Sequence, residues 1–141
     1  IMTTKQEIAT FLLRIAIGTG FLSAVASRLN LWGSKSSGWQ NFVNYTADTN
    51  QFLPTNFAPT LAVVATITEI SIGILLLIGY QTNTVATAAA ILTLLFALAM
   101  SFSFGIKEPL DYSVFAFSAA CFLLSTIPHH IWSLDNFLNH K

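Results

Sequence analysis

The fold is decided by an apolar run at residues 59–79, PTLAVVATITEISIGILLLIG. It has about 20 residues, the length that an α-helix needs to cross roughly 30 Å of hydrocarbon. Pro59 suits a first helical turn, with Thr55 or Asn56 as the expected cap. Glu69 is the single charged residue of the run. A charge at this depth costs about 3 kcal/mol on insertion scales, so the run predicts a membrane-spanning helix whose carboxylate needs a partner.

Three further apolar runs accompany this one. They cover about residues 8–27, 84–104 and 112–127, and the last is bounded by Pro109 and Asp111, expected as an N-cap pair, and by Pro128. The chain is 54% hydrophobic and 9% charged, with a mean hydropathy of +0.66. A soluble domain usually has about 25% charged residues. We therefore predict an all-α integral membrane protein, one domain over residues 1–141, whose four transmembrane helices form a bundle.

The segment between the first two runs predicts a short amphipathic helix. Its apolar residues recur with helical spacing at Trp39, Phe42, Val43, Thr46 and Ala47. Such a helix lies on the membrane interface or caps the bundle. Arg28, Trp32 and Trp39 are of the types found at headgroup level, so we expect them to be interfacial rather than part of a substrate-binding lid.

Arg14 in the first run and Glu69 in the second form the strongest candidate for a functional site. They carry opposite charges in adjacent spans, and their expected depths differ by roughly 5 Å, which an arginine stem can bridge. Gly18 and Gly73 each follow one turn later on the same helix face. These glycines admit either close helix crossing or a polar ligand head group. We therefore predict a buried Arg14–Glu69 ion pair with Gly18 and Gly73 as candidate lining residues.

Two further patterns predict helix packing. Small residues recur on one face of the third run, at Ala86, Ala90, Thr93, Ala97 and Ser101. Small residues allow helix backbones to approach closely in lipid, so this face is expected to pack against another helix. The second and third runs are joined by the short polar turn at residues 80–83, which makes them antiparallel neighbours.

Several classes of function find no support in the residues. A net charge of 0 gives no case for nucleic acid, and the lone Cys121 permits neither an intrachain disulfide nor a thiolate zinc site. His129 and His130 point about 100° apart if helical, and no apolar run contains a histidine. We therefore expect no metal and no haem, and the residues assign no enzymatic activity.

The first apolar run also imitates a secretory signal peptide. Lys5 precedes it, and the small residues Ala24, Val25 and Ala26 resemble a cleavage site. Arg14 interrupts the run, whereas the apolar core of a signal peptide is uninterrupted. We therefore expect a membrane span here.

The charged residues and glycines resemble those of a known family. Arg14, Gly18, Phe21 and the basic–leucine pair Arg28-Leu29 resemble the first helix of the DoxX-like family of small four-helix bacterial membrane proteins. Glu69, Gly73, Gly79 and Thr82 resemble its second helix, and the similarity extends to the ending Ser133-Leu134-Asp135. The chain departs from the family pattern at Val25, Ile72 and Asn83, where Gly, Gly and Arg are common.

The resemblance implies a four-helix fold in the bacterial inner membrane. The family includes a subunit of thiosulfate:quinone oxidoreductase, and many of its members have no assigned activity. The preferred hypothesis is an accessory or scaffold subunit without a cofactor of its own, which docks onto a second copy or onto a partner in a membrane complex. The alternative is a quinone-linked oxidoreductase component whose Arg14–Glu69 pair relays a proton or binds a polar head group. A small transporter is less favoured, because the sequence shows neither repeats nor matching broken helices.

Overall fold

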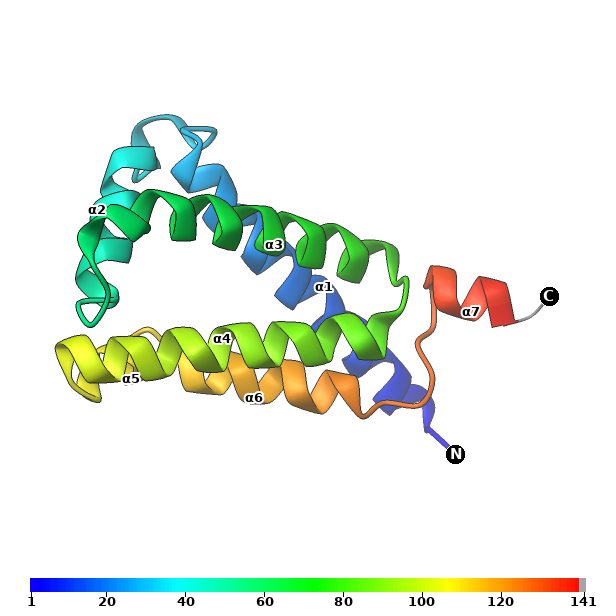
Figure 1. Ribbon diagram of the computed structural model, residues 1–141. Helices are drawn as coiled ribbons and strands as arrows, with labels where there is room; N and C mark the ends of the chain where they lie inside the picture. The colour runs from blue at the N-terminus through cyan, green and yellow to red at the C-terminus, as the bar shows by residue number, and fades with distance from the viewer. Residues whose placement is uncertain (140–141) are drawn as a thin grey trace.

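The computed structural model describes residues 1–139, and helices make up 78% of the structure (Figure 1). No strand occurs within the described residues. The helices in chain order are α1 (Thr4–Arg28), η1 (Gly33–Lys35), α2 (Trp39–Thr49), η2 (Thr55–Phe57), α3 (Ala58–Ile78), α4 (Thr82–Phe104), α5 (Lys107–Asp111), α6 (Val114–Ser125) and α7 (Leu134–Asn139). The predicted all-α architecture is confirmed, including a helix between the first two spans.

Three helices are long and apolar enough to cross a membrane, namely α1, α3 extended by η2, and α4. The fourth predicted span is shorter than expected, because α6 has 12 residues and a length of about 18 Å. Pro109 and Asp111 do not cap it, since both belong to α5. The chain then bends at Ser113, whose φ is +56°. On its own, α6 reaches across only part of the hydrocarbon.

The start of α3 differs from the expected capping. Pro59 does lie in the first turn, but Thr55 and Asn56 form the separate 3₁₀ turn η2 instead of a side-chain cap. At the other end, Gly79 terminates α3 in the left-handed conformation, with φ +79°. A side chain would be strained there and would collide with Ser133, so a glycine is required.

Helices α1 and α3 cross at Gly18 and Gly73. A Cβ on Gly18 would lie 3.1 Å from the Gly73 carbonyl oxygen, and a Cβ on Gly73 would lie 3.1 Å from that of Gly18 and 2.8 Å from Leu22. Both glycines are buried. They serve close packing between the helices, the first of the two roles expected for them, and neither belongs to the lining of the cavity described below.

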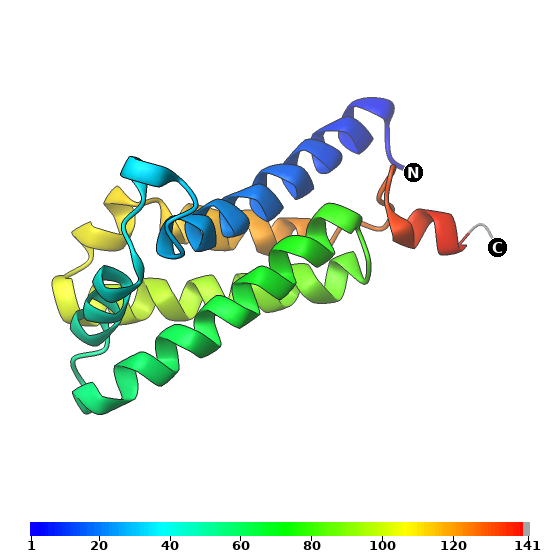
Figure 2. The ribbon, with the colours of Figure 1, turned by 90° about the horizontal axis from the view of Figure 1, so that it is seen from above.

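The small-residue face of α4 packs inward, as predicted. Ala86 and Ala97 are fully buried, and the Ser118 hydroxyl of α6 donates a hydrogen bond of 2.8 Å to the Ala90 carbonyl. Helices α4 and α6 run side by side in both views (Figures 1 and 2). This pair forms one side of the bundle, and α1 with α3 forms the other.

Helices α3 and α4 are antiparallel, as predicted, but they diverge. They meet at the turn after Gly79 and separate toward their opposite ends, where α2 lies across them (Figure 1). The Tyr45 ring of α2 stacks on Phe104 of α4, and the Ser103 hydroxyl donates to the Thr49 carbonyl. The wedge between α3 and α4 is therefore closed at its wide end by the amphipathic helix.

The crossing of α1 and α3 predicts different effects for alanine substitutions at Gly73 of α3, which lies in the crossing, and at Gly20 of α1, which lies outside it. We expect Gly73→Ala to lower the free energy of unfolding by about 1–3 kcal/mol, because the added methyl overlaps Leu22 and the Gly18 backbone. Gly20→Ala is the matched control, since its Cβ would meet Phe117 at an ordinary 3.5 Å. Thermal unfolding in detergent measures both, and equal effects would contradict a tight crossing at Gly73.

Candidate functional site

The buried carboxylate of Glu69 pairs with Arg28 and not with Arg14. Arg28 Nη1 donates to Glu69 Oε2, and Arg28 Nη2 donates to Glu69 Oε1 at 3.2 Å. Arg28 Nη1 also donates to the Thr66 hydroxyl at 3.2 Å. Arg28 is 8% exposed and Glu69 is 4% exposed. The expected burial of Glu69 is confirmed, whereas the expected Arg14–Glu69 pair is wrong. Arg28, expected at headgroup level, lies at the end of α1 with its side chain buried against α3.

The register of α1 against α3 explains why Glu69 pairs with Arg28 and not with Arg14. The helices are antiparallel and meet at Gly18 and Gly73, so four residues back along α1 correspond to four residues forward along α3. Arg14 therefore lies beside Leu77, about 12 Å along the axis from Glu69. Arg28 at the end of α1 reaches back toward the middle of α3, and its long side chain bridges the remaining distance.

Arg14 is fully buried and is held by main-chain oxygens. Its Nη1 donates to the carbonyls of Leu76 and Leu77 at 2.8 and 3.1 Å, in the last turn of α3. Its Nη2 donates to the carbonyls of Ile131 and Trp132 at 3.3 and 2.9 Å. These α3 carbonyls lie at the negative end of the helix dipole, which suits a cation. Arg14 thus ties α1 to the end of α3 and to the segment before α7.

A largely apolar cavity of about 400 Å³ lies in the wedge between α2, α3 and α4. Arg28 and Glu69 belong to its lining, together with residues at helical spacing on the two long helices. On α3 these are Leu61, Val64, Ala65 and Thr68, and on α4 they are Leu92, Leu95, Phe96 and Ala99. The volume falls within the range of small-molecule pockets, about 300–1,000 Å³. A nearly apolar chamber with one charge pair in its wall is the strongest candidate for a binding site.

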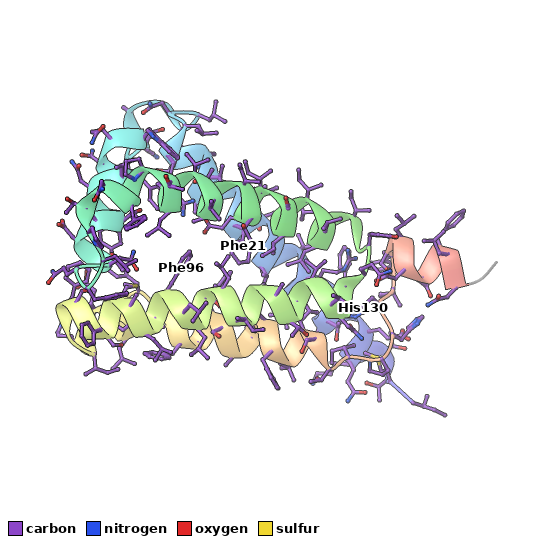
Figure 3. All side chains as sticks on the ribbon, in the orientation of Figure 1. Phe21, Phe96 and His130 are labelled. Carbon is purple, nitrogen blue, oxygen red and sulfur yellow. The ribbon has the colours of Figure 1, made fainter. Side chains whose placement is uncertain are left out.

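Aromatic rings line this cavity near the charges. The Arg28 guanidinium lies over the Phe42 ring of α2, 3.7 Å from its centroid. Tyr45 of α2 and Phe96 of α4 also belong to the lining, and Phe96 projects from α4 into the gap toward α3 (Figure 3). Cation–π contact orients the guanidinium, and flat rings favour a planar guest. Of the residues expected at headgroup level, Trp32 is 53% exposed and Trp39 begins α2, and neither lines the cavity.

The opposite end of the bundle is held by polar contacts around Asp135. Its carboxylate accepts hydrogen bonds from the N–H groups of Gln81 and Thr82 at 2.7 and 2.8 Å, so it caps α4 from a distance in sequence. The Ser133 hydroxyl accepts from Asn136 N–H and caps α7. Burial raises the pKa of Asp135, but the hydrogen bonds from Thr82 and Gln81 outweigh it and hold the pKa below 3.8.

His130 lies at the same end, where it is 7% exposed (Figure 3). Asn83 Nδ2 donates to the Ile127 carbonyl at 2.9 Å, so Asn83 Oδ1 accepts the hydrogen bond of 2.6 Å from His130 Nε2. This assigns the proton of the neutral ring to Nε2. Burial, and then the positive charge of Arg14, lower the pKa of His130 below 6.5. Within residues 1–139 no group of three or more His, Cys, Asp or Glu side chains is placed to hold a metal ion.

The helices, the buried charges and the apolar surface define a multi-pass helical membrane protein. Residues 9–102, two thirds of the chain, match the DoxX family model, so the chain belongs to the DoxX family. No curated protein and no solved structure matches the chain. The matched region holds Arg14, Arg28, Glu69 and nearly all of the cavity lining, whereas Asp135 lies outside it.

The observed pairing of Arg28 with Glu69 predicts the outcome of two double-mutant cycles. Arg28→Leu and Glu69→Leu should each cost about 3–5 kcal/mol, because each leaves one buried charge without its partner. The double variant should cost clearly less than the sum. A cycle between Arg14→Leu and Glu69→Leu should be additive within about 0.5 kcal/mol. Unfolding in detergent measures both cycles, and coupling only in the Arg14 cycle would contradict the observed pairing.

The environment of His130 predicts a pH dependence of stability. Because its folded-state pKa is lowered, the unfolded chain binds a proton more readily once the pH falls below 6.5. The unfolding temperature should therefore fall as the pH drops from about 7.5 to about 5, well above the range where Asp135 is protonated. His130→Gln should flatten this dependence. His129→Gln is the control and should leave it in place, and the opposite pattern would contradict the assignment to His130.

Proposed function

We propose that this protein binds a lipid-soluble molecule with a planar polar head, of the quinone class, in the cavity between α2, α3 and α4. On this proposal it serves as a ligand-binding subunit of a membrane redox assembly. The observation that carries the proposal is the buried Arg28–Glu69 pair in the wall of an otherwise apolar cavity of about 400 Å³. Ionisable groups inside a membrane protein are costly and mark functional sites by default.

The cavity lining supports a ringed head group. The rings of Phe42 and Phe96 supply flat apolar surface, and the Arg28 guanidinium supplies hydrogen-bond donors next to them. A quinone, when bound, accepts two electrons and two protons. The carbonyl oxygens of such a ring are acceptors that match arginine N–H groups. Glu69 is the one carboxylate in the lining. On this proposal it is the group that exchanges a proton with the bound ring.

A second candidate is the accessory or scaffold subunit predicted from the sequence. It is favoured because the buried charges already have hydrogen-bond partners within the protein. Both oxygens of Glu69 accept hydrogen bonds from Arg28, and Arg14 donates to four main-chain carbonyls. On this second proposal the pair stabilises the bundle and the chain docks onto a partner or onto a second copy. Binding of a ligand in the cavity separates the two candidates.

Filling the cavity tests the proposal without removing a charge. Ala65 lies in the lining one turn before Glu69, and Ala88 is an exposed alanine of α4 outside it. We expect Ala65→Trp to weaken binding of a ubiquinone with one isoprenoid unit about tenfold or more, because the indole occupies the space of the ring. Ala88→Trp should bind like the unchanged protein. Equilibrium binding in lipid nanodiscs measures both.

Glu69→Gln complements this experiment, because it keeps the shape of the side chain and removes its charge. It should alter quinone affinity if the head group lies against the pair. Saturable binding that ignores both Ala65→Trp and Glu69→Gln would place the quinone elsewhere. No saturable binding in any variant, with a partner protein retained through purification, would favour the scaffold candidate.

A further inference from the structure

We infer that the cavity opens sideways into the bilayer between α3 and α4, and that the hydrocarbon tail of its ligand leaves through this opening past Val64 and Leu95. The inference rests on the proposed function and deepens it, because it assigns the path of the tail. We call this opening the α3–α4 gap and define it by Val64 and Leu95. The ligand class is accordingly an amphiphile with a planar head and a chain.

The exposure of the cavity lining locates the opening. Val64 is 56% exposed and Leu95 is 58% exposed, and they are the two lining residues more than half exposed. They occupy opposite helices, one on α3 and one on α4, whose axes diverge from the turn at Gly79 (Figure 1). Both side chains are aliphatic, so the opening is apolar, like the interior of the cavity and like the lipid tails outside it.

The other directions out of the cavity are covered by packed side chains. Toward α2, Thr46 and Thr49 are buried. The contact between Tyr45 and Phe104 holds α2 against α4, and the contact between Phe52 and Phe102 holds the segment after α2 against α4. Toward the narrow end of the wedge, Ile72 is 4% exposed and Leu76 is fully buried. A tail that extends from a head group beside Glu69 therefore meets closed packing at both ends and lipid-facing surface at the α3–α4 gap.

The energetics of an apolar chain also favour a tail that leaves the cavity into the bilayer. A hydrocarbon chain gains nothing by leaving lipid for an apolar groove, because lipid tails are as apolar as leucine. The favourable contacts of the head come from Arg28, Glu69 and the aromatic rings, and the tail must only remain in an apolar environment throughout. The α3–α4 gap meets this requirement without any movement of α2.

Closing the gap with bulky side chains tests the inference. The probes are two quinones with the same ring, ubiquinone-0 without a tail and decylubiquinone with a ten-carbon tail. We expect Val64→Trp/Leu95→Trp to weaken decylubiquinone binding in nanodiscs about tenfold more than it weakens ubiquinone-0 binding, because the indoles obstruct the path of the tail. The control is Ile67→Trp/Ile91→Trp, because both residues are about as exposed, lie on the same two helices and do not line the cavity.

The outcomes separate this inference from the proposed function. If neither quinone binds saturably to the unchanged protein, the proposed function fails and the tail path fails with it. If both bind but the gap variant loses them equally, or loses neither, the cavity site stands and the tail path through the α3–α4 gap is overturned. Circular dichroism and thermal unfolding confirm that each variant is folded, and the Ile67→Trp/Ile91→Trp control should match the unchanged protein with both probes.

Discussion

A charge buried in an apolar membrane helix needs an oppositely charged or strongly polar partner, and this constraint organises the structure. Glu69 lies near the middle of α3, and Arg28 reaches it from the end of α1 with two parallel hydrogen bonds. The position of α1 against α3 follows from that contact together with the crossing at Gly18 and Gly73. The Phe42 ring over the Arg28 guanidinium connects the pair to α2. Three helices, α1, α2 and α3, thus meet at one ion pair.

The second arginine meets the same constraint in a different way. Arg14 donates hydrogen bonds to main-chain carbonyls in the last turn of α3 and in the segment before α7. Asp135 then caps α4 with its carboxylate, and the Asp135 N–H donates to the Gly79 carbonyl. These contacts hold the narrow end of the wedge together. The wide end, spanned by α2, encloses the cavity. Arg14 thus lies at the packed end of the wedge, and Arg28 lies at the end that contains the cavity.

The sequence predicted the helices better than their partners. Apolar length located α1, α3 and α4 because a membrane span depends on composition, and the inward face of α4 followed from its alanines. The predicted Arg14–Glu69 pair is wrong because the ends of the apolar runs do not give the relative depth of Arg14 and Glu69. Helix α1 begins at Thr4, before its apolar run, and its register against α3 is set by the crossing at Gly18 and Gly73. An antiparallel alignment of Gly18 with Gly73 was the signal that would have favoured Arg28. The distant cap at Asp135 had no comparable signal, because no local pattern joins it to Gln81 and Thr82.

The central claim is that the cavity beside Arg28 and Glu69 receives the head of a lipid-soluble ligand. Photo-crosslinking tests it most directly, with an azido-quinone in nanodiscs and mass spectrometry to locate the modified residues. The account predicts modification on the inner faces of α2, α3 and α4, at residues such as Phe42, Thr68 and Phe96, that excess unlabelled quinone suppresses. Modification confined to outward residues such as Ile67 and Ile91, unaffected by competitor, would contradict it.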